Sequence, residues 1–134
     1  MNDLTFSQVA EANRVRCRKW HDPDTEPWTG ADWSNAMCGE AGEAANVVKK
    51  LRRCETRTSS PMDPPEDELR RMLGHEIADV LLYAFLLADH YGIEVAPQVV
   101  EKFNLVSERQ GFPDRLAMHE VQIDGQGQTE ANDG

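Results

Sequence analysis

The chain has 134 residues, the length of one domain, of which 40% are hydrophobic, 28% charged and 7% aromatic. This composition is typical of a small globular domain and excludes a collagen, a membrane bundle and a wholly disordered chain. The 24 acidic residues outnumber the 14 basic ones, which gives a formal net charge of -10. Such a charge argues against a nucleic acid polymer as partner, but it permits a small phosphorylated ligand bridged by divalent cations.

Three sequence features favour a cytoplasmic protein. The cysteines Cys17, Cys38 and Cys54 are odd in number and widely spaced, so we expect reduced thiols rather than a zinc or disulfide site. The first twenty residues lack the apolar stretch of a secretion signal. The longest apolar run, Ile77 to Ala88, is too short to span a bilayer, and we expect no membrane partner.

The helical periodicity of apolar side chains predicts four helices and no strand. These helices are expected at Thr5 to about Trp20, Ala31 to Arg53, Pro64 to Tyr91 and Glu94 to Gln110. Four helices of these lengths favour an all-α, antiparallel four-helix bundle over residues 1–113. The polar residues 114–134 have almost nothing to bury, and we expect them to form a disordered C-terminal tail.

Local signals predict where these helices begin and end. Thr29, with Asp32 three residues later, is typical of the N-cap of the second helix. Asp63 followed by Pro64 predicts the start of the third helix, and Gly92 suits the left-handed residue that ends it. The connector over residues 55–65 is rich in Ser, Thr and Pro, has no packing pattern and is expected to be mobile.

The third predicted helix is apolar around its whole circumference. Between Ile77 and Ala88, eleven of twelve residues are apolar. Because a four-helix monomer covers only part of such a surface, we expect the remainder to meet another copy of the chain. The sequence therefore predicts a homodimer or homotetramer assembled through this helix.

Two pairs of acidic residues occupy positions that the apolar pattern assigns to the core. Glu40 and Glu43 share one face of the second helix, and Glu76 and Asp79 repeat this arrangement on the third. Like charges about 4 Å apart repel by roughly 4 kcal/mol at an effective dielectric near 20, so a neutralising group is needed. Four oxygen donors, with no Cys and no Glu-x-x-His spacing, favour magnesium, with manganese possible.

Salt bridges are the alternative explanation for these carboxylates. Their partners would be the basic residues of the same two helices: Lys49, Lys50, Arg52, Arg53, Arg70 and Arg71. We favour the metal site because a surface pair needs no apolar neighbours on its own stripe. His75 begins the string HEIAD, but the second histidine of an HExxH zinc site is absent, so it receives no ligand role.

The sequence around the carboxylates resembles the MazG-like, all-α nucleoside triphosphate pyrophosphohydrolase superfamily, whose signature is ExxE, a variable connector and ExxD. Here GEAGEAANVVKKLRR contains Glu40 and Glu43, and HEIADVLLYAFLLA contains Glu76 and Asp79. The resemblance spans about Trp33 to Pro113 and implies that the four carboxylates bind magnesium. It also implies hydrolysis of a nucleoside triphosphate to monophosphate and pyrophosphate, in nucleotide-pool housekeeping.

The segment EKFNLVSERQGFP looks like the superfamily's substrate-contacting region. The resemblance implies that Lys102 lies against the triphosphate, Asn104 near the phosphates or sugar, and Arg109 on phosphate or in a structural pair. Arg109 equally fits a cation near a helix C-terminus. Lys49 and Lys50 are weaker candidates for neutralising the leaving pyrophosphate.

Two further roles concern the chemistry and the base. Glu43 is our candidate for the catalytic base that takes the proton of the attacking water. Trp28 and Trp33 precede the first ExxE and could stack on a nucleobase, although ordinary packing is the commoner role of a tryptophan at helical spacing.

Other functions stay open at this stage. One is a phosphoribosyl-ATP pyrophosphatase-like enzyme, or an enzyme acting on a modified nucleotide. Another is a non-catalytic helical interaction protein whose apolar third helix is a docking surface. A carboxylate-bridged di-iron bundle ranks last, because it usually has Glu-x-x-His pairs and none occurs here.

Overall fold

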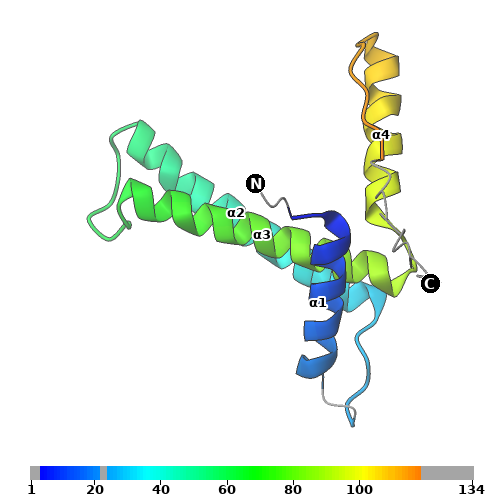
Figure 1. Ribbon diagram of the computed structural model, residues 1–134. Coiled ribbons are helices and arrows are strands. Elements are labelled where there is room, and N and C mark those ends of the chain that lie inside the picture. Colours follow the sequence, from blue (N-terminus) through cyan, green and yellow to red (C-terminus); the bar gives the residue numbers. More distant parts are fainter. Residues whose placement is uncertain (1–3, 22–23, 119–134) are drawn as a thin grey trace, which may run out of the picture. The chain divides into compact units, whose positions relative to one another are not determined.

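A computed structural model describes residues 4–21 and 24–118 (Figure 1). Within these ranges the chain forms four helices and no strand, which confirms the all-α fold class. The helices are α1 Phe6–Trp20, α2 Gly30–Glu55, α3 Glu66–His90 and α4 Val95–Gln110. None of these helices has the length and hydropathy needed to cross a membrane.

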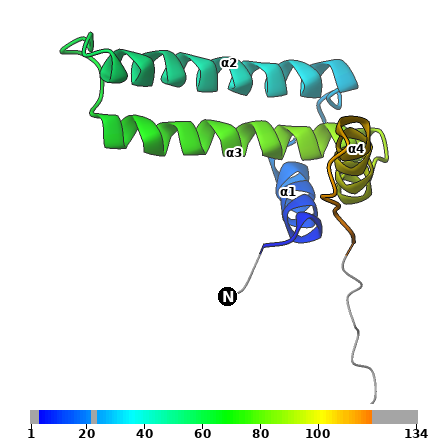
Figure 2. The same cartoon turned by 90° about the horizontal axis from the view of Figure 1, so that it is seen from above.

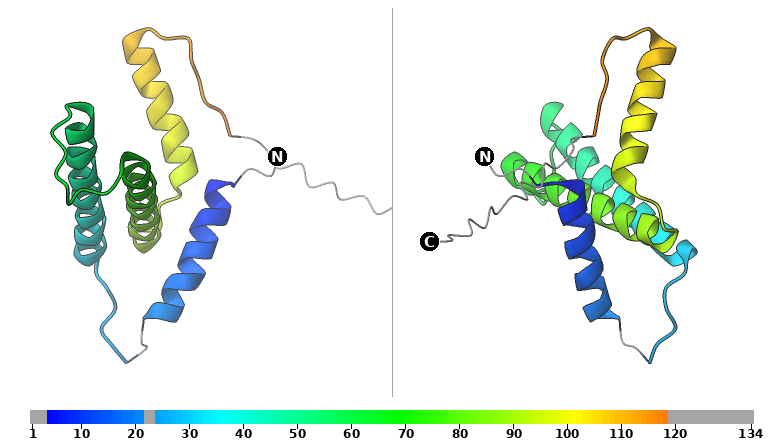
Figure 3. Two further views of the ribbon diagram at one scale, coloured as in Figure 1. Left: turned by 90° about the vertical axis from the view of Figure 1, so that its left-hand side faces the viewer. Right: turned by 45° about the vertical axis from the view of Figure 1, so that its right-hand side comes forward.

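The chain divides into two units, Met1–Ala96 and Pro97–Gly134. In the first unit, α2 and α3 run antiparallel along their length and α1 packs across α3 (Figure 2). Figure 3 shows α1 and α2 against different sides of α3. Most of α4 belongs to the second unit, so the packing of all four helices into one bundle stays a prediction. Residues 119–134 of the expected tail lie outside the described residues.

The core of the first unit lies where the helices meet. Its buried apolar residues are Trp33 and Val47 of α2 and Leu69, Phe85 and Leu86 of α3. Each such side chain contributes about 1.5–3 kcal/mol through removal of apolar surface from water. These contacts hold α2 against α3 on both sides of the segment where the four acidic residues lie.

α1 contacts α3 through an aromatic pair, a buried hydrogen bond and the exposed Arg14–Asp89 ion pair. The rings of Phe6 and Phe85 meet edge to face, with centroids 5.6 Å apart. Asn13 is only 4% exposed, and its Nδ2 donates a hydrogen bond of 2.7 Å to the Leu82 carbonyl oxygen. The buried amide is therefore satisfied by the backbone of α3.

The structure confirms two of the predicted helix ends. Thr29 caps α2: its side chain accepts from the Asp32 N–H, and the Asp32 carboxylate accepts from the Thr29 N–H at 2.8 Å. Gly92 follows α3 with φ 64°, the left-handed conformation that glycine adopts without steric cost.

The predicted start of α3 at Asp63 and Pro64 is wrong. The helix begins at Glu66 with Pro65 as its N-cap, and no side chain caps it. The reason is the Pro-Pro sequence, because the helical region is disfavoured for a residue that precedes proline. Pro64 precedes Pro65, so a helix start at Pro64 is disfavoured, and Asp63 lies two residues before the observed N-cap.

Asp63 instead closes the connector between α2 and α3. Its carboxylate accepts from Arg53 Nε at 2.8 Å and from the Ser60 N–H at 3.0 Å. α2 ends with Arg57 in the left-handed conformation, φ 55°, and the Thr58 N–H donates to the Arg53 carbonyl oxygen at 2.9 Å. The connector that we expected to be mobile is thus held by its own polar contacts.

The Arg53–Asp63 pair predicts how stability changes in acid. The hydrogen bond from Arg53, followed by that from Ser60, lowers the pKa of Asp63. A lowered pKa stabilises the fold above the ordinary aspartate pKa of about 3.9, and this contribution is lost as the pH falls through the lowered value. We expect Asp63→Asn to lower the Tm at pH 7 and to remove this acid-dependent loss in thermal unfolding scans.

Glu55→Gln is the matched control, since it breaks the exposed Arg52–Glu55 pair on the same turn of α2. We expect it to leave the Tm almost unchanged. Equal effects of the two variants would show that Asp63 does not close the connector.

Candidate metal centre

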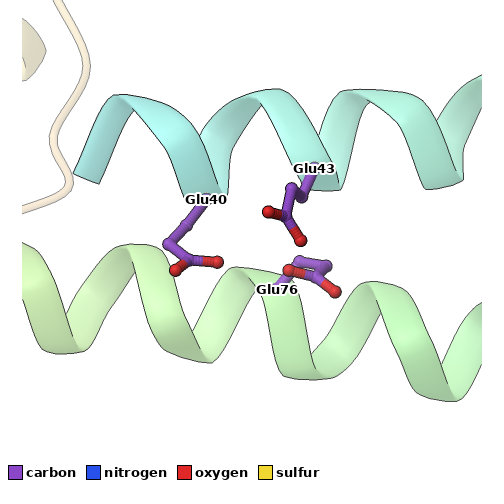
Figure 4. Close-up of side chains that lie close together, drawn as sticks. All are labelled: Glu40, Glu43 and Glu76. Atoms are coloured by element: carbon purple, nitrogen blue, oxygen red, sulfur yellow. The ribbon is translucent and has the colours of Figure 1, made fainter. Parts of the chain in front are cut away.

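Three of the four predicted metal ligands converge between α2 and α3 (Figure 4). Glu40 and Glu43 extend from α2 towards Glu76 of α3, and one carboxylate oxygen from each lies within 4.8 Å of the other two. Two oxygens on opposite sides of one magnesium ion are about 4.2 Å apart, so small side-chain rotations would place all three on one ion. Glu40 and Glu76 are half-buried, while Glu43 is exposed.

Asp79, the fourth predicted ligand, lies beside this trio and not within it. Its side chain is half-buried, and with Glu40 it lines a cavity of about 210 Å³ that α1 closes through Asn13, Arg16 and Trp20. The charge of Asp79 also acts on Glu40. The structure therefore places Asp79 next to Glu40, on the side of the carboxylates that faces α1.

Each negatively charged carboxylate makes ionisation of its neighbours less favourable. Burial raises the pKa of Glu40, and the charges of Glu43, Asp79 and Glu76 raise it further. Such a site lowers its free energy by taking up protons or cations. The arrangement has the negative charge and the oxygen donors that hard divalent cations require.

Salt bridges do not neutralise these residues in the part of the chain that the structure describes. Four of the basic side chains considered as partners pair elsewhere: Arg52 with Glu55, Arg53 with Asp63, Arg70 with Glu66 and Arg71 with Glu68. No ion pair joins a described Lys or Arg to any of the four carboxylates. The alternative explanation from the sequence therefore finds no support in this region.

An aromatic cavity of about 370 Å³ adjoins the acidic one. The residues that line it are Trp20, His21, Trp28, Trp33, Tyr83 and Leu86. The rings of Trp28 and Trp33 are 4.5 Å apart, and His21 lies 5.5 Å from each of them. Trp33 is 8% exposed, so it packs in the core and also lines the cavity.

The sequence analysis missed three ring-bearing residues of this aromatic cavity, Trp20, His21 and Tyr83. Tyr83 could have been found, because it follows Asp79 by one helical turn and shares its face of α3. Trp20 and His21 have no such signal. They reach the cavity only because the end of α1 crosses α3 beside Trp33, a contact between residues distant in the chain.

The predicted phosphate contacts lie away from the three converging carboxylates or in the second unit. Lys50 is half-buried two turns beyond Glu43, and its charge assists Arg53 in lowering the pKa of Asp63. Lys102 and Arg109 are exposed on α4. Their roles, and that of Lys50, stay predictions.

Asn104 of α4 has an observed structural contact. Its Nδ2 donates to the Leu116 carbonyl oxygen at 2.9 Å, and its Oδ1 accepts from the Leu116 N–H at 2.8 Å. The amide thereby fastens the segment after α4 to the helix. A contact between Asn104 and substrate would have to compete with these two hydrogen bonds.

Comparison of this chain with known protein families, with curated proteins and with solved structures finds no match. The likeness to the MazG-like superfamily therefore depends on the motif residues themselves. Any function must be argued from the geometry of the carboxylates and the adjoining cavities.

Removing the charge of Glu40 tests whether the carboxylates form a cation site. Because its pKa is raised, the metal-free protein should lose stability as the pH rises from the ordinary glutamate value of about 4.3 through the raised one. We expect Glu40→Gln to raise the metal-free Tm by a few degrees at pH 7, because the variant removes one of the mutually repelling charges. It should also reduce the Tm increase that manganese or magnesium gives the wild type.

Glu94→Gln is the control, because it removes one exposed charge between α3 and α4 and leaves the carboxylates intact. A wild-type Tm that does not respond to millimolar magnesium or manganese would contradict the metal site.

Proposed function

We propose that this protein is a divalent-metal-dependent nucleoside triphosphate pyrophosphohydrolase of the MazG-like kind. The observation that carries the proposal is the convergence of Glu40, Glu43 and Glu76 from two helices, with Asp79 beside them and no cation paired with any of the four among residues 4–21 and 24–118. A structural salt-bridge network has no need of such uncompensated charge. The aromatic cavity beside the carboxylates supports a substrate that combines phosphates with a planar ring.

Magnesium is the proposed cofactor, and manganese is an acceptable substitute for the same oxygen ligands. When bound, such an ion supplies a Lewis acid that polarises phosphoryl oxygens and lowers the pKa of an attacking water. Glu40 and Glu76 are the ligands held most firmly, because both are half-buried between α2 and α3. Asp79 extends the oxygen set towards the cavity closed by α1.

In the proposed reaction, a water oxygen bonds to the α-phosphorus while the bond to the bridging α–β oxygen breaks. The products are a nucleoside monophosphate and pyrophosphate. Glu43 takes the proton of the water in this scheme, because it is the exposed member of the trio and is accessible to solvent. Lys102, Arg109, Asn104 and Lys50 stay proposed contacts of the phosphates.

The aromatic cavity is the proposed site of the nucleobase. Its volume of about 370 Å³ admits a base, and the paired rings of Trp28 and Trp33 offer a surface for stacking. Trp28 is the more exposed of the two, at 39%. Of the two tryptophans, it therefore has more ring surface free to contact a ligand.

We further propose a cytoplasmic homodimer or homotetramer. Ile77 and Leu81 of α3 lie one turn apart on the same face and are 50% and 55% exposed. Burial of this apolar face against a second copy would remove it from water. A non-catalytic interaction protein would use the same face, and metal-dependent turnover distinguishes the two functions.

The central test is turnover of the eight common ribo- and deoxyribonucleoside triphosphates, with phosphoribosyl-ATP as a ninth substrate, in magnesium or manganese. We expect pyrophosphate release from at least one nucleotide. Glu43→Gln should lower kcat about 10²–10⁴-fold, the range for loss of a general base. Asp79→Asn should weaken activity at limiting metal, and Glu55→Gln should behave as wild type.

Inactivity of the wild type on all nine substrates, with metal present, would overturn the proposed function. Release of inorganic phosphate in place of pyrophosphate would refute the assignment of the α–β bond. Turnover in the presence of a chelator would refute the metal dependence.

The oligomer is tested by light scattering after size-exclusion chromatography. We expect Leu81→Glu to reduce the mass to that of one chain, because it places a charge within the face formed by Ile77 and Leu81. Val15→Glu makes the same change at another exposed apolar position, on α1, and should leave the mass unaltered. A wild type that elutes as a monomer would disprove the assembly.

A further inference from the structure

A basic side chain lines the acidic cavity without pairing with its carboxylates. The cavity of about 210 Å³ is bounded by Glu40 and Asp79, and Arg16 of α1 is the cation among its described lining residues. In the described chain neither carboxylate forms an ion pair with Arg16. Within a protein of net charge -10, an arginine kept apart from two adjacent acids requires a physical reason.

Arg16 is exposed on α1, and two other contacts orient its guanidinium. Arg16 Nη2 donates to Asn13 Oδ1 at 3.1 Å, and the Arg16 Cζ lies 4.8 Å from the centre of the Trp20 ring. Asn13 is in turn fixed by its hydrogen bond to the Leu82 carbonyl oxygen. The guanidinium is thus connected through Asn13 to the backbone of α3.

This arrangement leaves most of the guanidinium available to a ligand. Arginine has five N–H donors in a planar fork, and one nitrogen is engaged with Asn13. The free donors match the paired oxygens of a phosphate, the group for which a fixed guanidinium is best suited. Metal-free carboxylates repel a phosphate from this cavity, whereas divalent cations on them invert the local field.

The position of Arg16 selects one phosphate of the substrate. The acidic cavity shares Trp20, Tyr83 and Leu86 with the aromatic cavity, so Arg16 lies on the side of the carboxylates where the base is proposed to bind. In a nucleoside triphosphate the α-phosphate is the phosphate closest to the base. It is also the group attacked in the proposed reaction.

We propose that Arg16 binds the α-phosphate of the substrate, as a substrate-binding residue between the carboxylates and the aromatic cavity. This inference rests on the proposed function and adds to it a contact from α1 that the sequence motifs do not contain. A purely structural arginine would only offset the charge of Glu40 and Asp79 through space. The two roles differ in what the loss of Arg16 does to phosphate ligands.

The experiment compares Arg16→Gln with Arg18→Gln in the full chain. Arg18 is two residues away on a different face of α1, where it lines another cavity with Arg14, Asp89 and His90. The Arg18→Gln variant therefore loses the same charge from the same helix, and Arg18 does not line the acidic cavity. Five quantities are measured for each variant: kcat and KM with the best triphosphate, the Kd of manganese alone, and the inhibition constants of the product monophosphate and of pyrophosphate.

For Arg16→Gln we expect inhibition by the monophosphate to weaken ten- to hundredfold, the loss typical of a charged hydrogen bond. We expect kcat to fall, inhibition by pyrophosphate to change less than threefold, and manganese to bind as well as in the wild type or more tightly. Arg16→Lys, which keeps the charge without the fork, should give an intermediate loss. Arg18→Gln should match the wild type, and an unchanged Tm would show that each variant folds.

Three results would overturn the assignment of Arg16 and leave the hydrolase proposal intact. The first is that Arg16→Gln keeps the kcat and the monophosphate inhibition of the wild type. The second is that Arg16→Gln and Arg18→Gln weaken monophosphate inhibition equally. The third is that Arg16→Gln also weakens manganese binding, which would indicate a structural role. A wild type with no metal-dependent turnover would instead refute the proposed function, and the role of Arg16 with it.

Discussion

Repulsion between carboxylates across the α2–α3 interface is the constraint on which the rest of this structure depends. Glu40, Glu43 and Glu76 meet there with Asp79 beside them, and the raised pKa of Glu40 records the cost. A chain under selection for stability alone would place apolar side chains at these positions, since replacing buried charges by packed hydrophobic residues is often neutral or favourable. The proposed cation site rests on this uncompensated charge.

Buried apolar contacts lie on both sides of the acidic residues along the α2–α3 pair and offset this repulsion. Trp33, Phe85 and Leu86 are buried towards one end, where α1 crosses, and Leu69 is buried towards the connector. The Arg53–Asp63 contact then joins the two helices' ends through the connector. The acidic residues therefore lie in a segment of the α2–α3 pair that has buried apolar contacts on each side. Such packing would give the proposed ion site a fixed geometry before an ion binds.

The sequence predicted the elements whose signals are local, and it failed where the outcome depends on contacts between distant segments. Periodicity and the Thr29–Asp32 box were sufficient for the helices, and the i,i+3 spacing was sufficient for the two acidic pairs. The N-cap prediction for Asp63 was wrong for two reasons. The Pro-Pro sequence disfavours a helical Pro64, and the Asp63 carboxylate pairs with Arg53 of α2. The separation of Asp79 from the trio could not be predicted, and neither could the positions of Trp20, His21 and Arg16 around the two cavities. They follow from where α1 crosses α3, which no local pattern encodes.

The buried amide of Asn13 has a consequence for how α1 is seated. A hydrocarbon side chain at this position would let α1 slide or roll on α3 with little change in energy, because apolar contacts have no direction. An amide enclosed by protein must find the Leu82 carbonyl, and a shift of one residue would rotate it away by about 100° and strand its polar atoms at about 1–3 kcal/mol. The buried hydrogen bond of Asn13 thus favours one rotation of α1 about its own axis over the others that apolar contacts alone would allow.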